Sequence, residues 1–348
     1  MKEYSYEDIE AATKGFALDQ LIGKGSHGCV YKGTLRGGKQ VAVKKPLEKL
    51  QELEQDSKLD HEIDILASLH GNHLVNLLGV SHSSVDHNKH KLLVMEFMPN
   101  GSLHDLLHSS HSCPPSWPRR VIMVLQIAQA VLSLHEAAPA IIHRDVKSAN
   151  ILFDRHWNAK LADFSLAVRD DTLWTLEPTR PAGTFGYLDP WYTTPEKLSP
   201  KNDVFSFGVV LLEILSSRKV MDVACHPASI VAWAVPLIRA RREVEVYDGR
   251  MKLPQYMEGM IKHLLYISMR CVSSKEKRRP TMAEVASELQ GLAGKLWCPI
   301  WACRRMYACF YPWRRWAKRK VSTTKIVCKD HLFDGNGDED GDDSDDIY

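Results

Sequence analysis

The sequence predicts an α+β protein of two lobes, a small strand-rich lobe followed by a larger lobe built mainly from helices. Before Gly101, short runs rich in Val, Leu and Tyr are bounded by glycines, as is typical of strands. After Gly101, apolar residues recur at helical spacing. The 348 residues, 44% of them hydrophobic, can bury one large core or two modest ones, which excludes a wholly disordered or fibrous chain.

The first lobe is predicted to hold strands in an antiparallel sheet and one main helix. In the helix, over residues 51–69, Leu59, Ile63, Leu66 and Leu69 share one face. A polar run at 81–90 is expected to be a hairpin loop. The predicted strands cover residues 17–22, 29–35, 39–45, 74–80 and 91–98.

The second lobe is predicted to contain helices over residues 118–135, 203–215, 256–272 and 281–296. Pro118 suits a first helical turn, and Thr281 with Glu284 three residues later forms a capping box. The expected organisation is a flank, two lobes, a basic, aromatic and Cys-containing segment, and a disordered acidic tail. These parts span residues 1–15, 16–98, 99–296, 297–329 and 330–348.

Charge and hydropathy exclude some functions. The net charge of +2 hides a basic stretch, with ten Lys and Arg over 295–329, and an acidic end, with nine Asp and Glu over 330–348. A near-neutral body argues against nucleic acid as its main ligand. We find no run of eighteen apolar residues and no signal sequence, and the eight cysteines show no paired spacing. The expected location is the cytoplasm.

A glycine-rich pattern, G-x-G-x-x-G-x-V, lies between two strand-like runs. Glycines there let backbone N–H groups approach phosphate oxygens. A dinucleotide-binding loop would instead open a helix, so the pattern favours a hairpin lid over phosphates. The residues expected at this nucleotide site are Ile22, Gly23, Lys24, Gly25, Ser26, His27, Gly28, Cys29 and Val30.

Charged and amide side chains complete a phosphate-handling set. Lys44 follows on a strand and can hold phosphates if a carboxylate, most naturally Glu62, fixes it. Within HRDVKSAN, Asp145 and Asn150 have the D-x-x-x-x-N spacing, in which the acid accepts a hydroxyl proton and the amide coordinates a metal. Asp163 supplies a second oxygen donor for that metal.

These segments together resemble a eukaryotic protein kinase, and more closely the plant receptor-like kinase and Pelle group, in particular its receptor-like cytoplasmic members. The resemblance covers about residues 4–296 and includes, in family order, YSYEDIEAATKGF, MEFMPNGSL, GTFGYLDP, NDVFSFGVVLLEIL and KRRPTM. It implies the bilobal kinase fold, ATP with Mg²⁺ or Mn²⁺, and transfer of the γ-phosphoryl group to protein hydroxyls. Lys147 resembles the serine/threonine form, whose lysine contacts the γ-phosphate.

The resemblance also implies roles by position. Lys44 and Glu62 would form an ion pair, Asp145 would be the base, and Asn150 with Asp163 would hold Mg²⁺. Further roles follow for the catalytic loop, which would be braced by Arg144 and Asp203, and for the adenine pocket, which would be bounded by Met95 and by a hinge from Glu96 to Met98.

Two departures from the family pattern support an alternative, a weakly active kinase or pseudokinase scaffold. Ser165 replaces a glycine, and a Cβ there would disfavour left-handed backbone by roughly 1–2 kcal/mol. Trp191 replaces a glutamate that would pair with Arg279, so Arg279 is expected to lose its usual partner unless Glu196 substitutes. Retention of every phosphate- and metal-handling side chain favours the active enzyme.

The segment 167–184 is expected to be an activation loop. Arg144, directly before the catalytic aspartate, suggests control by phosphorylation, because its charge otherwise needs an anion. The candidate sites are Thr172, Thr175, Thr179 and Thr184. His104, His108 and His111 with Cys113 could be arranged as metal ligands, but a solvated polar loop is favoured there.

Residues 297–320 combine tryptophans, cysteines and basic side chains. One interpretation is peripheral membrane contact at the inner face of the plasma membrane, with Cys298, Cys303 or Cys309 acylated. The other is a segment that packs on the second lobe or binds a partner. Expected partners are protein substrates and a receptor kinase.

Overall fold

The computed structural model describes most of the chain up to Leu296, where one compact unit ends. For residues 52–58 only the backbone is described. The described ranges are 1–25, 28–46, 52–69, 71–82, 91–109, 113–170, 181–194 and 197–296. The predictions for Ser26, His27, Glu196 and residues 297–348 therefore lie outside the described residues.

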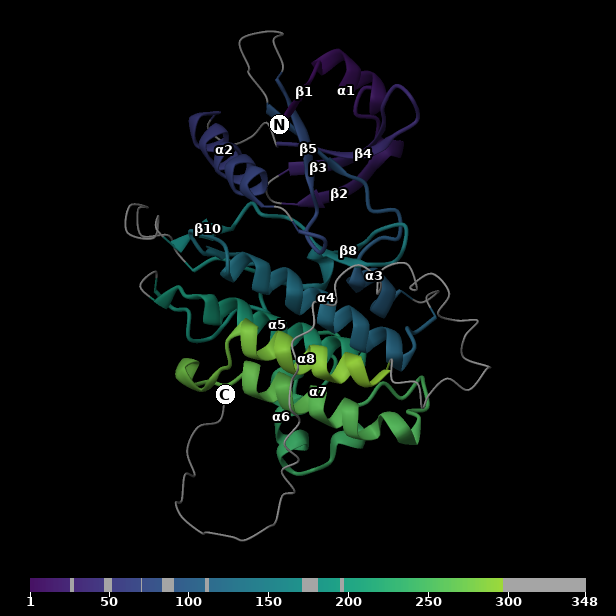
Figure 1. Ribbon diagram of the computed structural model, residues 1–348, viewed down its shortest axis with the longest axis vertical. Coiled ribbons are helices and arrows are strands. Elements are labelled where there is room, and N and C mark those ends of the chain that lie inside the picture. The colour runs from purple at the N-terminus through teal and green to yellow at the C-terminus, as the bar shows by residue number, and fades with distance from the viewer. Residues whose placement is uncertain are drawn as a thin grey trace, which may run out of the picture. The chain divides into compact units, whose positions relative to one another are not determined.

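The small lobe is a six-stranded sheet in the order β1-β5-β6-β4-β3-β2, with two helices (Figure 1). Its pairs are antiparallel except β1 with β5. The strands are β1 (Lys2–Tyr4), β2 (Leu21–Gly25), β3 (Gly28–Thr34), β4 (Gln40–Lys45), β5 (Leu77–His82) and β6 (Lys91–Glu96). The helices are α1 (Tyr6–Ala12) and α2 (Glu52–Ser68), with a 3-10 turn at Leu18–Gln20.

The N-terminal residues contribute to this sheet, which the sequence did not predict. Strand β1 runs parallel to β5, and a Cβ on Gly79 would lie 2.0 Å from the carbonyl oxygen of Lys2. Ile9 of α1 is fully buried in a small cluster with Val41 and Val43. Glycine in β5 therefore permits the close approach of β1.

Two predicted strands begin later than expected. The strand predicted from residue 17 starts at Leu21, because Leu18–Gln20 form a 3-10 turn in which the Asp19 carboxylate accepts hydrogen bonds from Lys14 and Gln20. The strand predicted from residue 74 starts at Leu77. Apolar content alone does not place a strand end when local polar contacts favour a turn.

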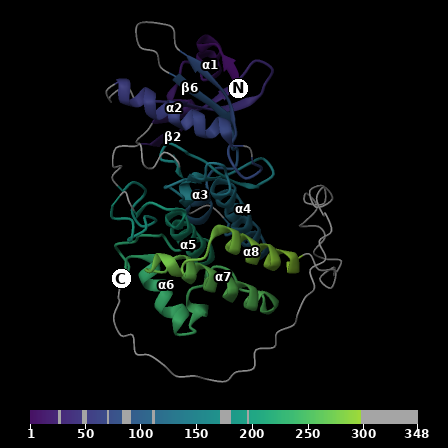
Figure 2. The ribbon, with the colours of Figure 1, turned by 60° about the vertical axis from the view of Figure 1, so that its left-hand side comes forward.

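The large lobe consists of helices with short strand pairs near the small lobe (Figures 1 and 2). The helices are α3 (Leu103–His108), α4 (Trp117–His135), α5 (Pro200–Ser216), α6 (Ile230–Arg239), α7 (Glu258–Cys271) and α8 (Met282–Leu296). The strands β7 (Ile141–Ile142) and β10 (Val168–Arg169) pair, as do β8 (Ile151–Phe153) and β9 (Ala159–Leu161). The 3-10 turns are Ser148–Asn150, Glu243–Glu245, Gln255–Met257 and Glu276–Arg278.

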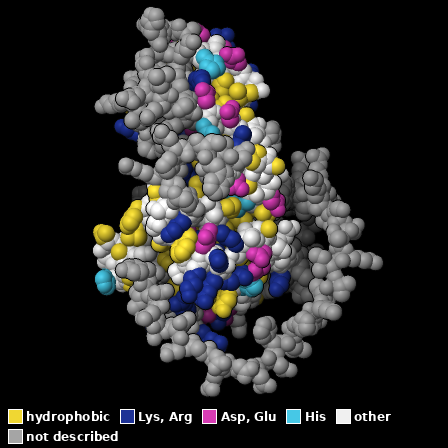
Figure 3. Space-filling model, turned by 90° about the vertical axis from the view of Figure 1, so that its left-hand side faces the viewer, with side chains coloured by type: hydrophobic (Ala, Val, Ile, Leu, Met, Phe, Trp, Pro, Cys, Tyr) yellow, Lys and Arg dark blue, Asp and Glu magenta, His cyan; other side chains and the backbone are white. Residues whose placement is uncertain are grey.

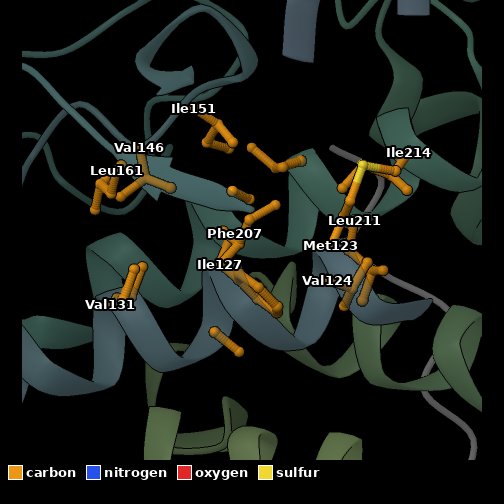
Figure 4. Packing of buried hydrophobic residues seen from close by; sticks show 14 of the residues in the cluster. Met123, Val124, Ile127, Val131, Val146, Ile151, Leu161, Phe207, Leu211 and Ile214 are labelled. Atoms are coloured by element: carbon orange, nitrogen blue, oxygen red, sulfur yellow. The ribbon is translucent and has the colours of Figure 1, made fainter. Parts of the chain in front are cut away.

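Helix α5 is central to this lobe and contacts α4, α6 and α7. Ser199 begins it with a capping box, and every residue from Asn202 to Leu215 is buried. Figure 4 shows Val146 and Ile151, which flank Lys147 and Asn150, lying near Phe207 of α5 and Ile127 of α4, all in one hydrophobic core. The core thus anchors the segment that carries the polar site residues.

Helices α3 and α6 were not predicted. Ser102 starts α3 by a capping box with Asp105, and Ser229 starts α6. Among the described residues, no helix combines the length and apolar character needed to cross a bilayer. Figure 3 shows Lys and Arg side chains gathered on part of one face of the helical lobe, with acidic and hydrophobic groups between them.

Candidate active site

Lys44 joins the small lobe to the large one. Its Nζ lies 2.7 Å and 2.8 Å from the two carboxylate oxygens of Glu62 on α2, and 3.1 Å from Oδ1 of Asp163 in the large lobe. Lys44 and Glu62 are both buried. Burial works to lower the pKa of Lys44, but the two carboxylates outweigh it and raise this pKa above its ordinary value. The amine therefore stays charged between two acids.

The loop expected to be catalytic brings two more predicted residues, Asn150 and Lys147, to the carboxylate of Asp145. Asn150 donates through Nδ2 to Oδ2 of Asp145 at 3.0 Å, and Lys147 Nζ lies 2.7 Å from the same oxygen. Thr184 donates its hydroxyl to Oδ1 of Asp145 at 2.6 Å and accepts from Lys147 at 2.7 Å. The contact between Thr184 and Asp145 joins residues 39 positions apart, so no local pattern indicated it, and Thr184 was expected only as a phosphorylation candidate.

The carboxylate of Asp203 binds the backbone of the loop at residues 143 and 144, which is the bracing that the resemblance implied. The backbone N–H groups of His143 and Arg144 donate to its carboxylate at 2.8 and 2.9 Å, and His135 lies 3.1 Å away. Burial works to raise the pKa of Asp203, but these hydrogen bonds outweigh it and lower this pKa. Arg144 has a φ of 69°, a left-handed conformation that these contacts maintain.

The expectation about Ser165 is wrong. Ser165 is not in the left-handed region; Asp163 is, with a φ of 62°. The Ser165 hydroxyl donates to Oδ1 of Asp163 at 2.9 Å. Burial works to raise the pKa of Asp163, but Lys44 and then the Ser165 hydroxyl hold it well below its usual range. The serine thus adds a contact to the carboxylate and causes no left-handed strain at its own position.

The glycine-rich residues form the β2–β3 hairpin, not the start of a helix. Ile22 to Gly25 lie on β2, and Gly28 to Val30 lie on β3. Gly28 has a φ of 154°, and a Cβ there would lie 2.5 Å from the carbonyl oxygen of Lys45. Strand β3 can therefore meet the end of β4 closely only with glycine at this position.

The predicted hinge follows β6. Met98 is buried with Val75 and Ala162, so it contacts both lobes. The Glu96 carboxylate accepts from Lys160 Nζ at 2.6 Å and from the backbone and side chain of Asn76. Lys160 was not predicted as a partner of the hinge, because no local pattern links β9 to β6.

The expectation that Arg279 lacks a partner is also wrong. Asp189, in YLDP, accepts from both terminal nitrogens of Arg279, at 2.5 and 2.7 Å. Both side chains are fully buried. Trp191 is 43% exposed, and the amine of Lys197 lies 4.5 Å from its ring centre. The carboxylate of Asp189, two residues before Trp191, is therefore the partner of Arg279 that was expected to be absent.

Comparison with known proteins identifies the family of this chain. Residues 16–289 match the protein kinase domain model. Two serine/threonine-protein kinase-like proteins of Arabidopsis thaliana are 44% and 46% identical, over 84% and 83% of this chain and 80% and 87% of their own lengths. A proline-rich receptor-like protein kinase of the same plant is 40% identical over 82% of this chain, which spans 40% of that relative. The chain therefore belongs to the protein kinase family, within its plant receptor-like kinase branch.

Proposed function

We propose that this protein transfers the γ-phosphoryl group of ATP to serine and threonine hydroxyls of other proteins. One observation carries the proposal: Lys44 contacts both Glu62 and Asp163, so a single buried amine connects the small lobe, its helix α2 and the acid expected to bind metal. Phosphoryl transfer depends mainly on placing charges around the transferred group, and this contact fixes three of them.

Asn150 and Asp163 are the residues proposed to hold Mg²⁺ or Mn²⁺. The fit is good, because the low pKa of Asp163 keeps its carboxylate ionised. The amide nitrogen of Asn150 donates a hydrogen bond to Asp145, which leaves the amide oxygen as a metal ligand. Oxygen ligands of this kind suit Mg²⁺. When bound, the metal would neutralise charge that develops on the phosphate oxygens.

The remaining residues divide between binding and proton transfer. The backbone of the β2–β3 hairpin and of Glu96 to Met98 would position the nucleotide, since the Glu96 carboxylate already binds Lys160. Asp145 would accept the proton of the attacking hydroxyl. Lys147, held between Asp145 and Thr184, would stabilise the negative charge of the γ-phosphate.

The alternative, a scaffold with little activity, rested on Ser165 and Trp191. Ser165 donates to Asp163, and Asp189 pairs with Arg279, so neither departure removes a contact on which the site depends. These contacts favour the active enzyme over the scaffold.

A radioactive ATP assay on the full chain tests the proposal, with a generic protein acceptor and Mg²⁺. Removing a general base typically costs 10²- to 10⁴-fold, so Asp145→Asn should lower labelling by about that factor. Exposed Asp19 provides a control, because its carboxylate pairs with Lys14 and Gln20 at the surface and Asp19→Asn should leave labelling unchanged. Equal labelling by wild type and Asp145→Asn would support the scaffold instead.

Regulation and location extend the proposal. Thr172, Thr175 and Thr179 lie outside the described residues, whereas Thr184 already binds Asp145. A phosphate on Thr184 would place its negative charge next to the carboxylate of Asp145. We therefore propose that activation-loop phosphorylation occurs within residues 171–180. Phosphosite mapping of the active protein tests this, and modification of Thr184 alone would contradict it.

We also propose that residues 297–320 contact the inner face of the plasma membrane, where a receptor kinase would meet this protein. The basic and aromatic composition of the segment and its three cysteines support this. Cys298, Cys303 and Cys309→Ser should shift the protein from the membrane to the soluble fraction. An unchanged distribution would contradict the proposal.

A further inference from the structure

Two histidines lie one helical turn apart at the start of the large lobe. His104 and His108 both belong to α3, and their ring centres are 4.9 Å apart. The capping box between Ser102 and Asp105 fixes this turn. The interpretation of these histidines as part of a solvated loop is therefore wrong, and they share one helix face.

A buried acid from a distant part of the chain faces them. Glu213 of α5 is 1% exposed, and its Oε1 lies 2.8 Å from Nε2 of His108. One ligand atom from each of His104, His108 and Glu213 lies within 4.8 Å of the others. Among the described residues, His104, His108 and Glu213 are the group of His, Cys, Asp and Glu side chains whose ligand atoms lie this close together.

The charge of Glu213 is only weakly compensated. Its other contacts are the neutral hydroxyls of Ser148, 2.9 Å from Oε1, and Tyr187, 2.7 Å from Oε2. Its ion-pair partner in the described part of the chain is His108, which carries charge only when protonated. Burial of Tyr187 beside this carboxylate raises the tyrosine pKa, so the phenol remains a donor. A divalent cation would supply the missing positive charge.

The donor set indicates which cation. Two imidazole nitrogens and one carboxylate oxygen are ligands that Zn²⁺ takes in open tetrahedral sites, with water as the fourth ligand, whereas Mg²⁺ prefers oxygen alone. Zinc–ligand bonds of about 2.0–2.1 Å separate tetrahedral ligand atoms by roughly 3.3 Å. His108 and Glu213 need only a small separation to reach that distance, and the exposed side of His104 provides access from solvent.

We propose that His104, His108 and Glu213 form a zinc site, separate from the nucleotide site. In the metal-free protein, His108 and Glu213 are joined by a hydrogen bond. When the ion binds, both side chains ligate it and His104 provides the third ligand.

Zinc titration of the full chain against a chromophoric chelator tests this, with millimolar Mg²⁺ present to saturate the nucleotide site. The background carries Cys298, Cys303 and Cys309→Ser, which removes three thiols from the competition. His104→Ala should weaken the binding of one zinc equivalent by tenfold or more, because loss of an outer-shell partner alone typically costs 10- to 100-fold and His104 is proposed as a direct ligand. His104 is exposed, so its variant should fold normally.

His263→Ala is the matched control. His263 is also exposed and lies 3.1 Å from a carboxylate, that of Glu288, but it belongs to no such three-residue group in the described chain. The His263→Ala variant should bind zinc with the same affinity and stoichiometry as the unaltered background. Equal affinity and stoichiometry for His104→Ala and its background would overturn the proposal, as would equal weakening by both histidine variants. Both readouts are binding, so they are independent of kinase activity.

Discussion

The pair between Arg279 and Asp189 provides the sharpest test of how the large lobe is stabilised. Asp189→Asn keeps the side-chain shape and removes the charge. Arg279 would then be a buried cation without its anionic partner, although the carbonyl oxygens of Ser273 and Lys201 remain as acceptors, at 2.8 and 3.1 Å. Breaking a buried ion pair from one side typically costs about 3–5 kcal/mol, so the free energy of unfolding should fall by that amount.

Urea unfolding of the full chain, followed by tryptophan fluorescence, measures the change. Asp19→Asn is the control, because the pair of Asp19 with Lys14 is exposed, with side chains 60% and 65% accessible, and should contribute little. Trp191→Glu adds a second comparison by placing a carboxylate at the family position. If Trp191→Glu stabilised the protein, or if Asp189→Asn cost no more than Asp19→Asn, the assignment of Asp189 as the partner of Arg279 would be wrong.

Three further predictions follow from individual contacts. Ser165→Ala removes a hydrogen-bond donor that lies 2.9 Å from the carboxylate of Asp163, and should raise the Mg²⁺ concentration for half-maximal activity severalfold. Ser165→Thr keeps the hydroxyl and should leave that concentration unchanged. Equal Mg²⁺ dependence of the two variants would refute this. Gly79→Ala places a Cβ against β1 and should destabilise the protein by about 1–3 kcal/mol, with faster amide exchange in residues 2–4; unchanged exchange would argue against the β1–β5 pair. Burial works to raise the pKa of Asp248, but hydrogen bonds led by Arg250 lower it. Its charged form therefore stabilises the fold above the unfolded-state pKa of about 3.9, and this contribution is lost as pH falls towards the lower folded-state pKa. Asp248→Asn should thus flatten the fall in unfolding free energy between about pH 5 and pH 3, and an unchanged slope would contradict the shift.

The local sequence predicted much of the fold and named side chains that the structure brings into contact. Helical spacing indicated α4, α5, α7 and α8 within a few residues, since each buries one apolar face or more. The ordered set of Lys44, Asp145, Asn150 and Asp163 identified the chemistry, because those residue types at those spacings suit phosphate and metal. Element ends were less predictable: β2 and β5 start later than their apolar runs suggest.

Contacts between distant segments were decided by the tertiary structure. Asp189 reaches Arg279 across 90 positions, and His108 reaches Glu213 across 105, so no local pattern could indicate either partner. The same holds for Ser165, whose effect depends on which residue occupies the left-handed region. The order of residues specifies which chemical groups this protein has and which helices and strands carry them. Only folding decided which groups meet, because burial makes each polar group depend on the partner that packing brings within hydrogen-bond distance.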